Sequence, residues 1–130
     1  MTSAAPVSAL ARSVAVAAAC AAAAMPALAN DFTPVRDEGT FLSLVEGREL
    51  RLGRFGVSLT LLPDGRIMGS ALGWDLTGNW DWKDGYFCRD IDWSGYAIPF
   101  NCQLVEVRDN QVLRFTVARG TGDSASFKLR

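Results

Sequence analysis

The 130-residue sequence contains no histidine. Because histidine is the most common general base, its absence excludes a Ser-His-Asp arrangement and leaves the serines without an obvious activating group. It also removes most zinc sites, since only three cysteines remain as strong zinc ligands. We therefore expect a protein that is not an enzyme and that carries neither a cofactor nor a metal ion.

Strongly basic stretches are absent as well. Arg12 is the only charged residue before Asp31, and the chain after Arg12 has 12 Lys and Arg against 14 Asp and Glu, a net charge of −2. Domains that bind nucleic acid through a charged face show the opposite balance, with clustered Lys and Arg. The composition therefore predicts no nucleic-acid partner.

The first 29 residues have the features of a secretory signal peptide. A run of small apolar residues extends from Val14 to Met25, and Ala27-Leu28-Ala29 forms an A-x-A cleavage site. The apolar run is too short and too rich in alanine for a transmembrane helix, which needs about 20 residues. The sequence predicts a signal peptide over 1–29 and one small domain over 30–130. We expect that domain to be periplasmic or secreted, monomeric, and without a transmembrane segment after cleavage.

Cleavage at this site leaves two of the three cysteines, Cys88 and Cys102. An even number of cysteines in an oxidising compartment predicts one disulfide bond, which would stabilise the fold by roughly 3 kcal/mol. The third cysteine, Cys20, follows three alanines and resembles a degenerate lipoprotein box. The simpler interpretation is that Cys20 is removed with the signal peptide.

The segment after the signal peptide predicts one short helix. Phe41, Leu44 and Val45 have the i, i+3, i+4 spacing of one helical face, and Gly47 is a natural stop. A helix starting near Asp37 would present these three side chains to the rest of the domain. We expect it to plug or flank the sheet that follows.

From Arg48 onward, apolar residues alternate with polar ones, which is the period of a β-strand. About eight short strands are predicted, separated by turns such as Pro63-Asp64-Gly65, Lys83-Asp84-Gly85 and Asp109-Asn110. These connections are too short for parallel pairing, so the sheet is an antiparallel meander. Its apolar face must be covered, which favours a small closed barrel, with a two-sheet sandwich as the alternative. The interior of such a barrel is filled by side chains or holds one small ligand.

All four tryptophans and both tyrosines lie between Gly73 and Cys102. Exposed aromatic faces can stack on apolar ligands or sugar rings, while nearby carboxylates accept hydrogen bonds. In the alternative interpretation, Trp80 and Trp82 lie on one side of a strand and fill the barrel core. The candidate ligand-binding residues are Trp74, Trp80, Trp82, Tyr86, Trp93 and Tyr96.

The segment from Trp93 to Pro99 lies between the two cysteines and combines turn residues with large apolar ones. A loop that only reverses the chain needs two to five residues and no aromatic side chain. We therefore predict that this segment is a loop and carries the binding activity. The alternative is that Trp93, Tyr96 and Ile98 fold back and cap one end of the barrel.

Several features of the chain form a recurring layout: Phe41 and Gly47 of the leading helix, Pro63-Asp64-Gly65, Gly78-x-Trp80-x-Trp82, Asp84-Gly85-Tyr86-x-Cys88, and Cys102. This layout resembles that of small exported alphaproteobacterial proteins of unknown function with a lipocalin-like barrel. The resemblance implies an exported barrel and no established activity. Some members carry an automatic dihydrodipicolinate reductase label, which this sequence does not support. The fragment Gly65-Arg66-Ile67-Met68-Gly69 follows a turn here and starts a strand, whereas the reductase motif opens a helix.

Two functional hypotheses of different classes follow from the sequence. The first is an exported binding protein that holds a small apolar or glycan ligand with the Trp/Tyr cluster. The second is a protein-binding module of the cell envelope, of the inhibitor or stress type, that acts through loops at one end of the barrel. An internal cavity would favour the first, and exposed aromatic residues gathered at one end would favour the second.

Overall fold

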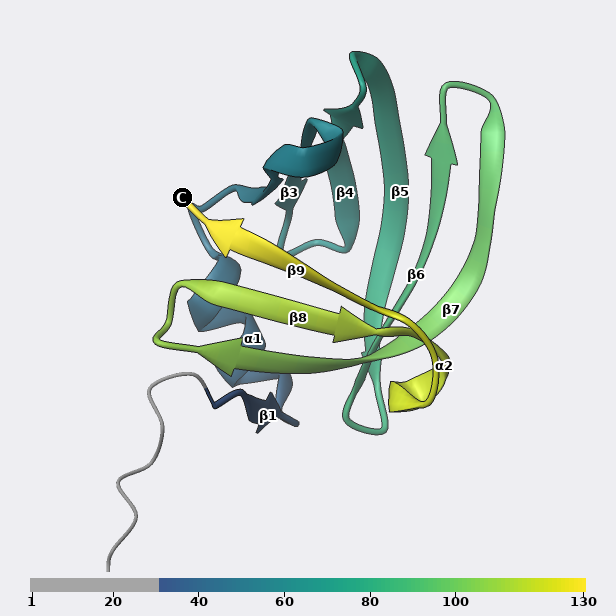
Figure 1. Cartoon of the computed structure of the whole chain (residues 1–130). Helices are drawn as coiled ribbons and strands as arrows, with labels where there is room; N and C mark the ends of the chain where they lie inside the picture. Colours follow the sequence, from purple (N-terminus) through teal and green to yellow (C-terminus); the bar gives the residue numbers. More distant parts are fainter. Residues whose placement is uncertain (1–30) are drawn as a thin grey trace, which may run out of the picture.

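The computed structural model describes residues 31–130. The predicted signal peptide and Cys20 lie outside these residues. Figure 1 shows a barrel of strongly curved strands with helix α1 in its lower part. The elements in chain order are β1 (Thr33–Val35), α1 (Glu38–Val45), β2 (Leu50–Leu52), η1 (Gly53–Phe55), β3 (Val57–Leu61), β4 (Arg66–Ala71), β5 (Trp74–Lys83), β6 (Tyr86–Trp93), β7 (Tyr96–Arg108), β8 (Val112–Thr116), α2 (Val117–Gly120) and β9 (Ser124–Leu129).

Strands β2 to β9 form a closed antiparallel barrel, which confirms the predicted fold class. Each strand pairs with its neighbours in sequence, and β9 closes the ring by pairing with β2. Closure of the ring removes the two edge strands that an open sheet would have. Small β domains avoid edge-to-edge association in this way. The sandwich alternative is therefore wrong.

Strand β1 was not predicted and lies outside the closed ring. It pairs with the second half of β7, where Thr33 lies opposite Val107 and Val35 opposite Val105. This half of β7 extends past the end of β6 and would otherwise leave an edge unpaired. Three residues that include a proline are too short to show a strand period in the sequence.

Three hairpins of the ring, β4–β5, β5–β6 and β6–β7, have connections of only two residues. The two central residues of each have positive φ, which matches the twist of the flanking strands. Glycine supplies the second of these positions in three cases because it adopts positive φ without a steric cost. The central pairs are Leu72-Gly73, Asp84-Gly85 and Ser94-Gly95. The β7–β8 connection has three residues, and its first two, Asp109 and Asn110, also have positive φ.

Helix α1 plugs the lower end of the barrel. The Asp37 side chain caps its first turn by accepting a hydrogen bond from the Thr40 backbone N–H at 2.8 Å. The predicted helical face is confirmed, because Phe41, Leu44 and Val45 are all buried. Phe41 is 0% exposed and lies at the centre of an aromatic cluster. Its ring centroid is 5.6 Å from that of Trp80, 4.9 Å from Trp82, 5.3 Å from Phe87 and 6.4 Å from Phe115.

The predicted cysteine pair joins β6 to β7. Cys88 and Cys102 lie directly opposite each other, with their sulfur atoms at a bonded distance of 2.09 Å. Just beyond this pair the register shifts: Arg89 faces Asn101, but Ile91 faces Ile98. The extra residue on β7 forms a bulge that contains Pro99, which has no N–H to donate to a regular ladder.

The segment from Trp93 to Pro99 is not a loop, so that prediction is wrong. Trp93 ends β6, Ser94-Gly95 forms a two-residue turn, and β7 begins at Tyr96. In Figure 1 the β6–β7 hairpin rises beyond β8 and β9 at the upper end of the molecule. No helix among residues 31–130 has the length and apolar character needed to cross a membrane.

Candidate ligand-binding cavity

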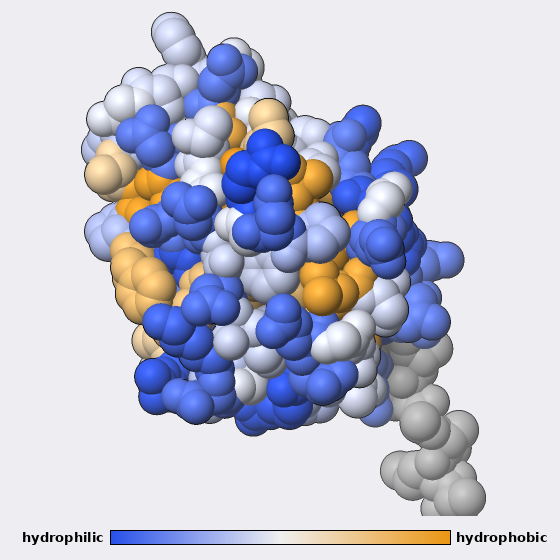
Figure 2. All heavy atoms as spheres, turned by 180° about the vertical axis from the view of Figure 1, so that it is seen from behind, coloured by the Kyte–Doolittle hydropathy of each residue, from blue (hydrophilic) through white to orange (hydrophobic). Residues whose placement is uncertain are grey.

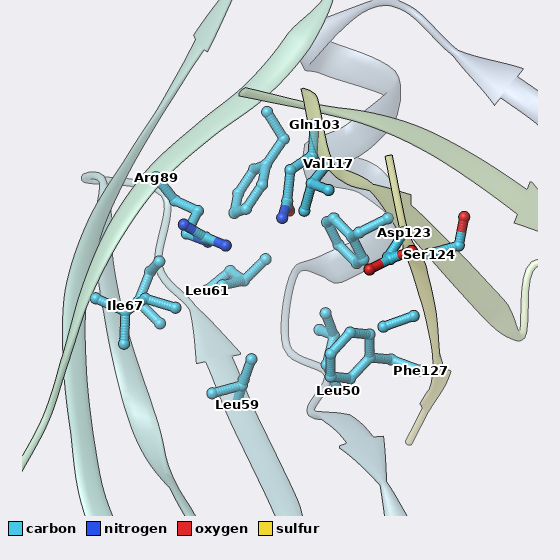
Figure 3. A pocket seen from close by; sticks show the side chains of 14 residues that line it. Leu50, Leu59, Leu61, Ile67, Arg89, Gln103, Val117, Asp123, Ser124 and Phe127 are labelled. Carbon is cyan, nitrogen blue, oxygen red and sulfur yellow. The ribbon is translucent and has the colours of Figure 1, made fainter. Parts of the chain in front are cut away.

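A cavity of about 290 Å³ lies inside the barrel (Figure 3). This volume is at the lower end of the range for small-molecule sites. Every strand of the ring except β5 contributes to its wall, together with Val117 of α2 and the turn before β9. The apolar wall consists of Leu50, Leu59, Leu61, Ile67, Phe87, Ile91, Phe115, Val117, Ala125 and Phe127.

At the level of the cavity, β5 carries a glycine instead of a large side chain. Gly78 lies between Ile67 of β4 and Ile91 of β6 in the sheet, and both isoleucines line the cavity. A Cβ atom at Gly78 would lie 2.3 Å from the backbone oxygen of Asp90, so no larger residue fits without a shift of the strands. Leu76 and Trp80, two positions away on either side, are both buried.

Aromatic rings separate the cavity from helix α1. Phe87 and Phe115 line the cavity, and their ring centroids lie 5.2 Å apart. Both rings also pack against Phe41 on the helix side. Edge-to-face contacts of this kind hold rings in fixed positions. The helical plug and the aromatic layer thus close the lower end of the cavity.

Two polar side chains enter this apolar space from neighbouring strands. Arg89 of β6 lies on the inward face, opposite Asn101, between the inward-facing Phe87 and Ile91. Its Nη1 donates a hydrogen bond to the backbone oxygen of Pro99 at 2.8 Å. Burial lowers the pKa of Arg89 from its usual value, and the nearby Asp90 carboxylate opposes this effect. A guanidinium remains charged under such conditions.

Gln103 of β7 is the second polar group in the wall. It is only 7% exposed, and its amide points toward the centre of the cavity in Figure 3. Within residues 31–130 no hydrogen bond reaches the side chain of Gln103, and neither of its amide atoms is fully enclosed. Solvent therefore reaches the amide, and a ligand that displaces this water has to supply a hydrogen-bond partner in its place.

The segment around Asp123 and Ser124 forms the most exposed part of the cavity rim. Val117 donates its backbone N–H to the Asp123 carbonyl at 3.0 Å, and the Ser124 and Thr116 hydroxyls are hydrogen-bonded at 2.7 Å. The side chain of Asn101 accepts a bond from the Ala118 backbone N–H, which ties α2 to β7. Because Asp123 and Ser124 are exposed, the cavity opens to solvent beside them.

None of the six predicted aromatic site residues lines this cavity. Trp80 is 7% exposed, packs in the core, and donates its indole N–H to the Leu62 carbonyl at 2.9 Å. Trp82 and Trp93 are partly buried, and their indole N–H groups donate to the carbonyls of Arg36 and Ala71. These hydrogen bonds hold the three indole rings in fixed positions within the barrel, outside the cavity lining.

The other three predicted residues are more exposed. Trp74 is 64% exposed and Tyr96 is 69% exposed, near the two turns at the upper end of the barrel. Tyr86 is partly buried, and its ring lies between the guanidinium groups of Arg36 and Arg119, at 5.3 and 5.5 Å from the ring centroid. The structure therefore does not bring the six residues together into one site.

The sequence contains a signal for the polar residues of the cavity. In the alternating stretch Phe87-x-Arg89-x-Ile91-x-Trp93, Arg89 is the only charged residue in the apolar register. A charge at an inward position of a small barrel has few structural explanations. Gln103 holds the equivalent place in β7, in the same register as Val105.

Comparison of the chain with protein-family models, with curated proteins and with solved structures found no match. The geometry of the barrel interior and of its surface is therefore the basis for the functional proposals that follow.

Proposed function

We propose that this protein is an exported, non-catalytic binding protein that holds one small, mostly apolar ligand inside its barrel. The observation that carries the proposal is the internal cavity, whose wall is apolar apart from a few polar groups. Small-molecule sites combine these two features, because apolar contacts supply affinity and a few polar groups fix orientation. The disulfide between Cys88 and Cys102 supports an oxidising location such as the periplasm or the exterior.

The residues that would contact the ligand are not the six aromatic residues predicted from the sequence. Leu59, Ile67, Ile91 and Phe127 form the sides of the cavity, and Phe87 and Phe115 its inner end. Trp80 and Trp82 support this layer from behind through Phe41. The tryptophans thus contribute to the shape of the site without contact to the ligand.

Filling the cavity tests the proposal. Ala125 lines the cavity on β9, whereas its neighbour Ser126 is exposed. Titration calorimetry with 1-octanol should detect saturable binding to the unmodified protein. Ala125→Leu should abolish that binding by occupying the space, and the matched control Ser126→Leu should leave it unchanged. Equal binding of octanol to the unmodified protein and to Ala125→Leu would show that the ligand does not enter the barrel.

A protein-binding role is the second candidate, and the exposed apolar residues at the upper end favour it. Figure 2 shows apolar patches on the back of the molecule, separated by hydrophilic side chains. Phe55, Leu72, Trp74 and Tyr96 are all more than half exposed. Exposed aromatic side chains are common anchors of protein interfaces. A Trp74→Ala/Tyr96→Ala double variant should then lose a purified partner but keep octanol binding.

A further inference from the structure

Arg89 is a cation in an apolar cavity without an anionic partner. None of the ion pairs found among residues 31–130 includes it. A guanidinium has five N–H donors, and the bond to the Pro99 carbonyl occupies only one nitrogen. The neighbouring Asp90 is exposed on the outer face, where its Oδ1 accepts a bond from the Asn79 backbone N–H at 3.3 Å. The remaining donors of Arg89 are therefore available to a ligand.

Gln103 is placed to bind the same group as Arg89. Gln103 lies opposite Phe87 and Arg89 lies opposite Asn101, so the two residues are diagonal neighbours on paired antiparallel strands. Diagonal neighbours on one face are roughly 7–8 Å apart at the backbone, a distance that two long side chains can bridge. Figure 3 shows the guanidinium and the amide both directed toward the middle of the cavity.

We propose that the cavity recognises a monocarboxylate with a compact apolar tail, because the guanidinium of Arg89 and the amide of Gln103 lie on neighbouring strands and both point into a cavity whose wall is mostly apolar. This proposal rests on the proposed ligand-binding function. Arginine presents parallel N–H groups that match both oxygens of a carboxylate, and the amide NH₂ of Gln103 donates a further bond. Fixing the carboxylate there directs the tail toward Leu59, Ile67 and Phe127.

The size and the charge of the site define the ligand class further. A water molecule occupies about 30 Å³ of liquid, so 290 Å³ corresponds to about ten water-sized groups. An aliphatic acid of about eight carbons or an aryl-substituted short acid fits this space. Asp123 at the exposed rim disfavours a second anionic group at the entrance. The site therefore selects monocarboxylates over dicarboxylates.

A pair of ligands with the same tail tests the proposal on the unmodified protein. Octanoate and 1-octanol differ only in the group that would face Arg89 and Gln103. Titration calorimetry at pH 7 should give about ten- to hundredfold tighter binding for octanoate, which is the range of charge-assisted hydrogen bonds. Equal affinities would overturn the carboxylate assignment and leave the proposed function intact. Absence of binding for both ligands would overturn the assignment and the proposed function together.

Substitutions test which side chains cause the preference for octanoate over 1-octanol. Arg89→Met should reduce octanoate affinity about ten- to hundredfold and leave octanol affinity unchanged. Arg54→Met, which removes an exposed cation outside the cavity, is the matched control and should change neither affinity. If Arg89→Met retains the preference for octanoate, Arg89 does not bind the carboxylate and the proposal is wrong.

Gln103→Glu provides a second route in case Arg89→Met does not fold. The new carboxylate would repel octanoate and pair with Arg89, so octanoate binding should be lost. Octanol binding by the same sample reports that the barrel is still formed. Retained octanoate binding in Gln103→Glu would place the anion elsewhere and overturn the proposal.

Discussion

The substitution Phe41→Ala tests whether helix α1 is a structural plug of the barrel. Phe41 is fully buried, and its ring packs against two tryptophans and two phenylalanines. Truncation of a buried phenylalanine costs about 3–5 kcal/mol, and each lost aromatic pair adds to the cost of lost burial. We therefore expect a loss of about 4 kcal/mol. With an m-value of about 2 kcal/mol/M in urea, the unfolding midpoint should fall by about 2 M.

Urea unfolding followed by tryptophan fluorescence is the assay for this substitution. Ser43→Ala is the matched control, because Ser43 lies on the exposed side of the same helix. That variant should remain within about 0.5 kcal/mol of the unmodified protein. A loss of less than about 1 kcal/mol for Phe41→Ala would mean that the barrel is stable without the plug, and the described role of α1 would be wrong.

Three further predictions concern other parts of the fold. Gly78→Ala should destabilise the protein by about 1–3 kcal/mol, because the added Cβ meets the Asp90 backbone at 2.3 Å; Gly53→Ala, where the Cβ has open space, should be near neutral in the same urea assay. Hydrogen bonds from the Thr40 backbone N–H and then its hydroxyl lower the pKa of Asp37. The stability from Asp37 is therefore complete above its ordinary pKa of 3.8 and is lost as the pH falls through the lowered value. Asp37→Asn should accordingly show a smaller drop in Tm between pH 5 and pH 2, and identical pH profiles would contradict this. Mass spectrometry without reductant should find the chain two hydrogens lighter than after reduction, and Cys102→Ala should lose about 2–5 kcal/mol; free thiols in protein purified from the periplasm would contradict the disulfide.

The fold could be predicted because its determinants are local. The period of two from Arg48 onward places Leu76, Trp80 and Phe87 on the inward face, and each is buried. The short turns force antiparallel neighbours, and neighbours in sequence become neighbours in the sheet. The spacing of Phe41, Leu44 and Val45 fixes the face of the helix in the same way. Each of these features follows from a few consecutive residues.

The Trp93–Pro99 segment shows where local patterns mislead. Ser94 and Gly95 form a turn with positive φ at both residues, and in this segment only these two and Pro99 at the bulge leave the ladder. The apolar residues after the turn were attributed to a binding loop. They belong instead to a strand that projects beyond the end of β8, so the side chains of Tyr96 and Phe100 are exposed. A strand without a covered face does not show alternation that sequence analysis can detect.

The cavity could not be predicted from the pattern of residues alone. Its volume depends on how β3, β4 and β6 curve toward β9 after the ring closes, and closure is a property of the whole sheet. Gly78 and Arg89 are both visible in the sequence. Their significance for the barrel interior can be judged only once the structure shows that both positions face inward. The aromatic cluster attracted the functional interpretation because tryptophan is rare and large. In this fold Trp80 fills the core, Trp82 and Trp93 pack against it, and Trp74 is exposed.

The disulfide lies next to the two polar residues that enter the cavity from β6 and β7. Arg89 follows Cys88 in the chain and Gln103 follows Cys102, so the covalent bond lies beside both polar groups of the wall. A shift of one residue in strand register turns every side chain to the opposite face. The bulge at Pro99 begins immediately beyond this point and interrupts the ladder that would otherwise hold the register. The Cys88–Cys102 bond therefore holds the pairing of β6 and β7 next to this interruption, and it helps to keep Arg89 and Gln103 directed into the barrel.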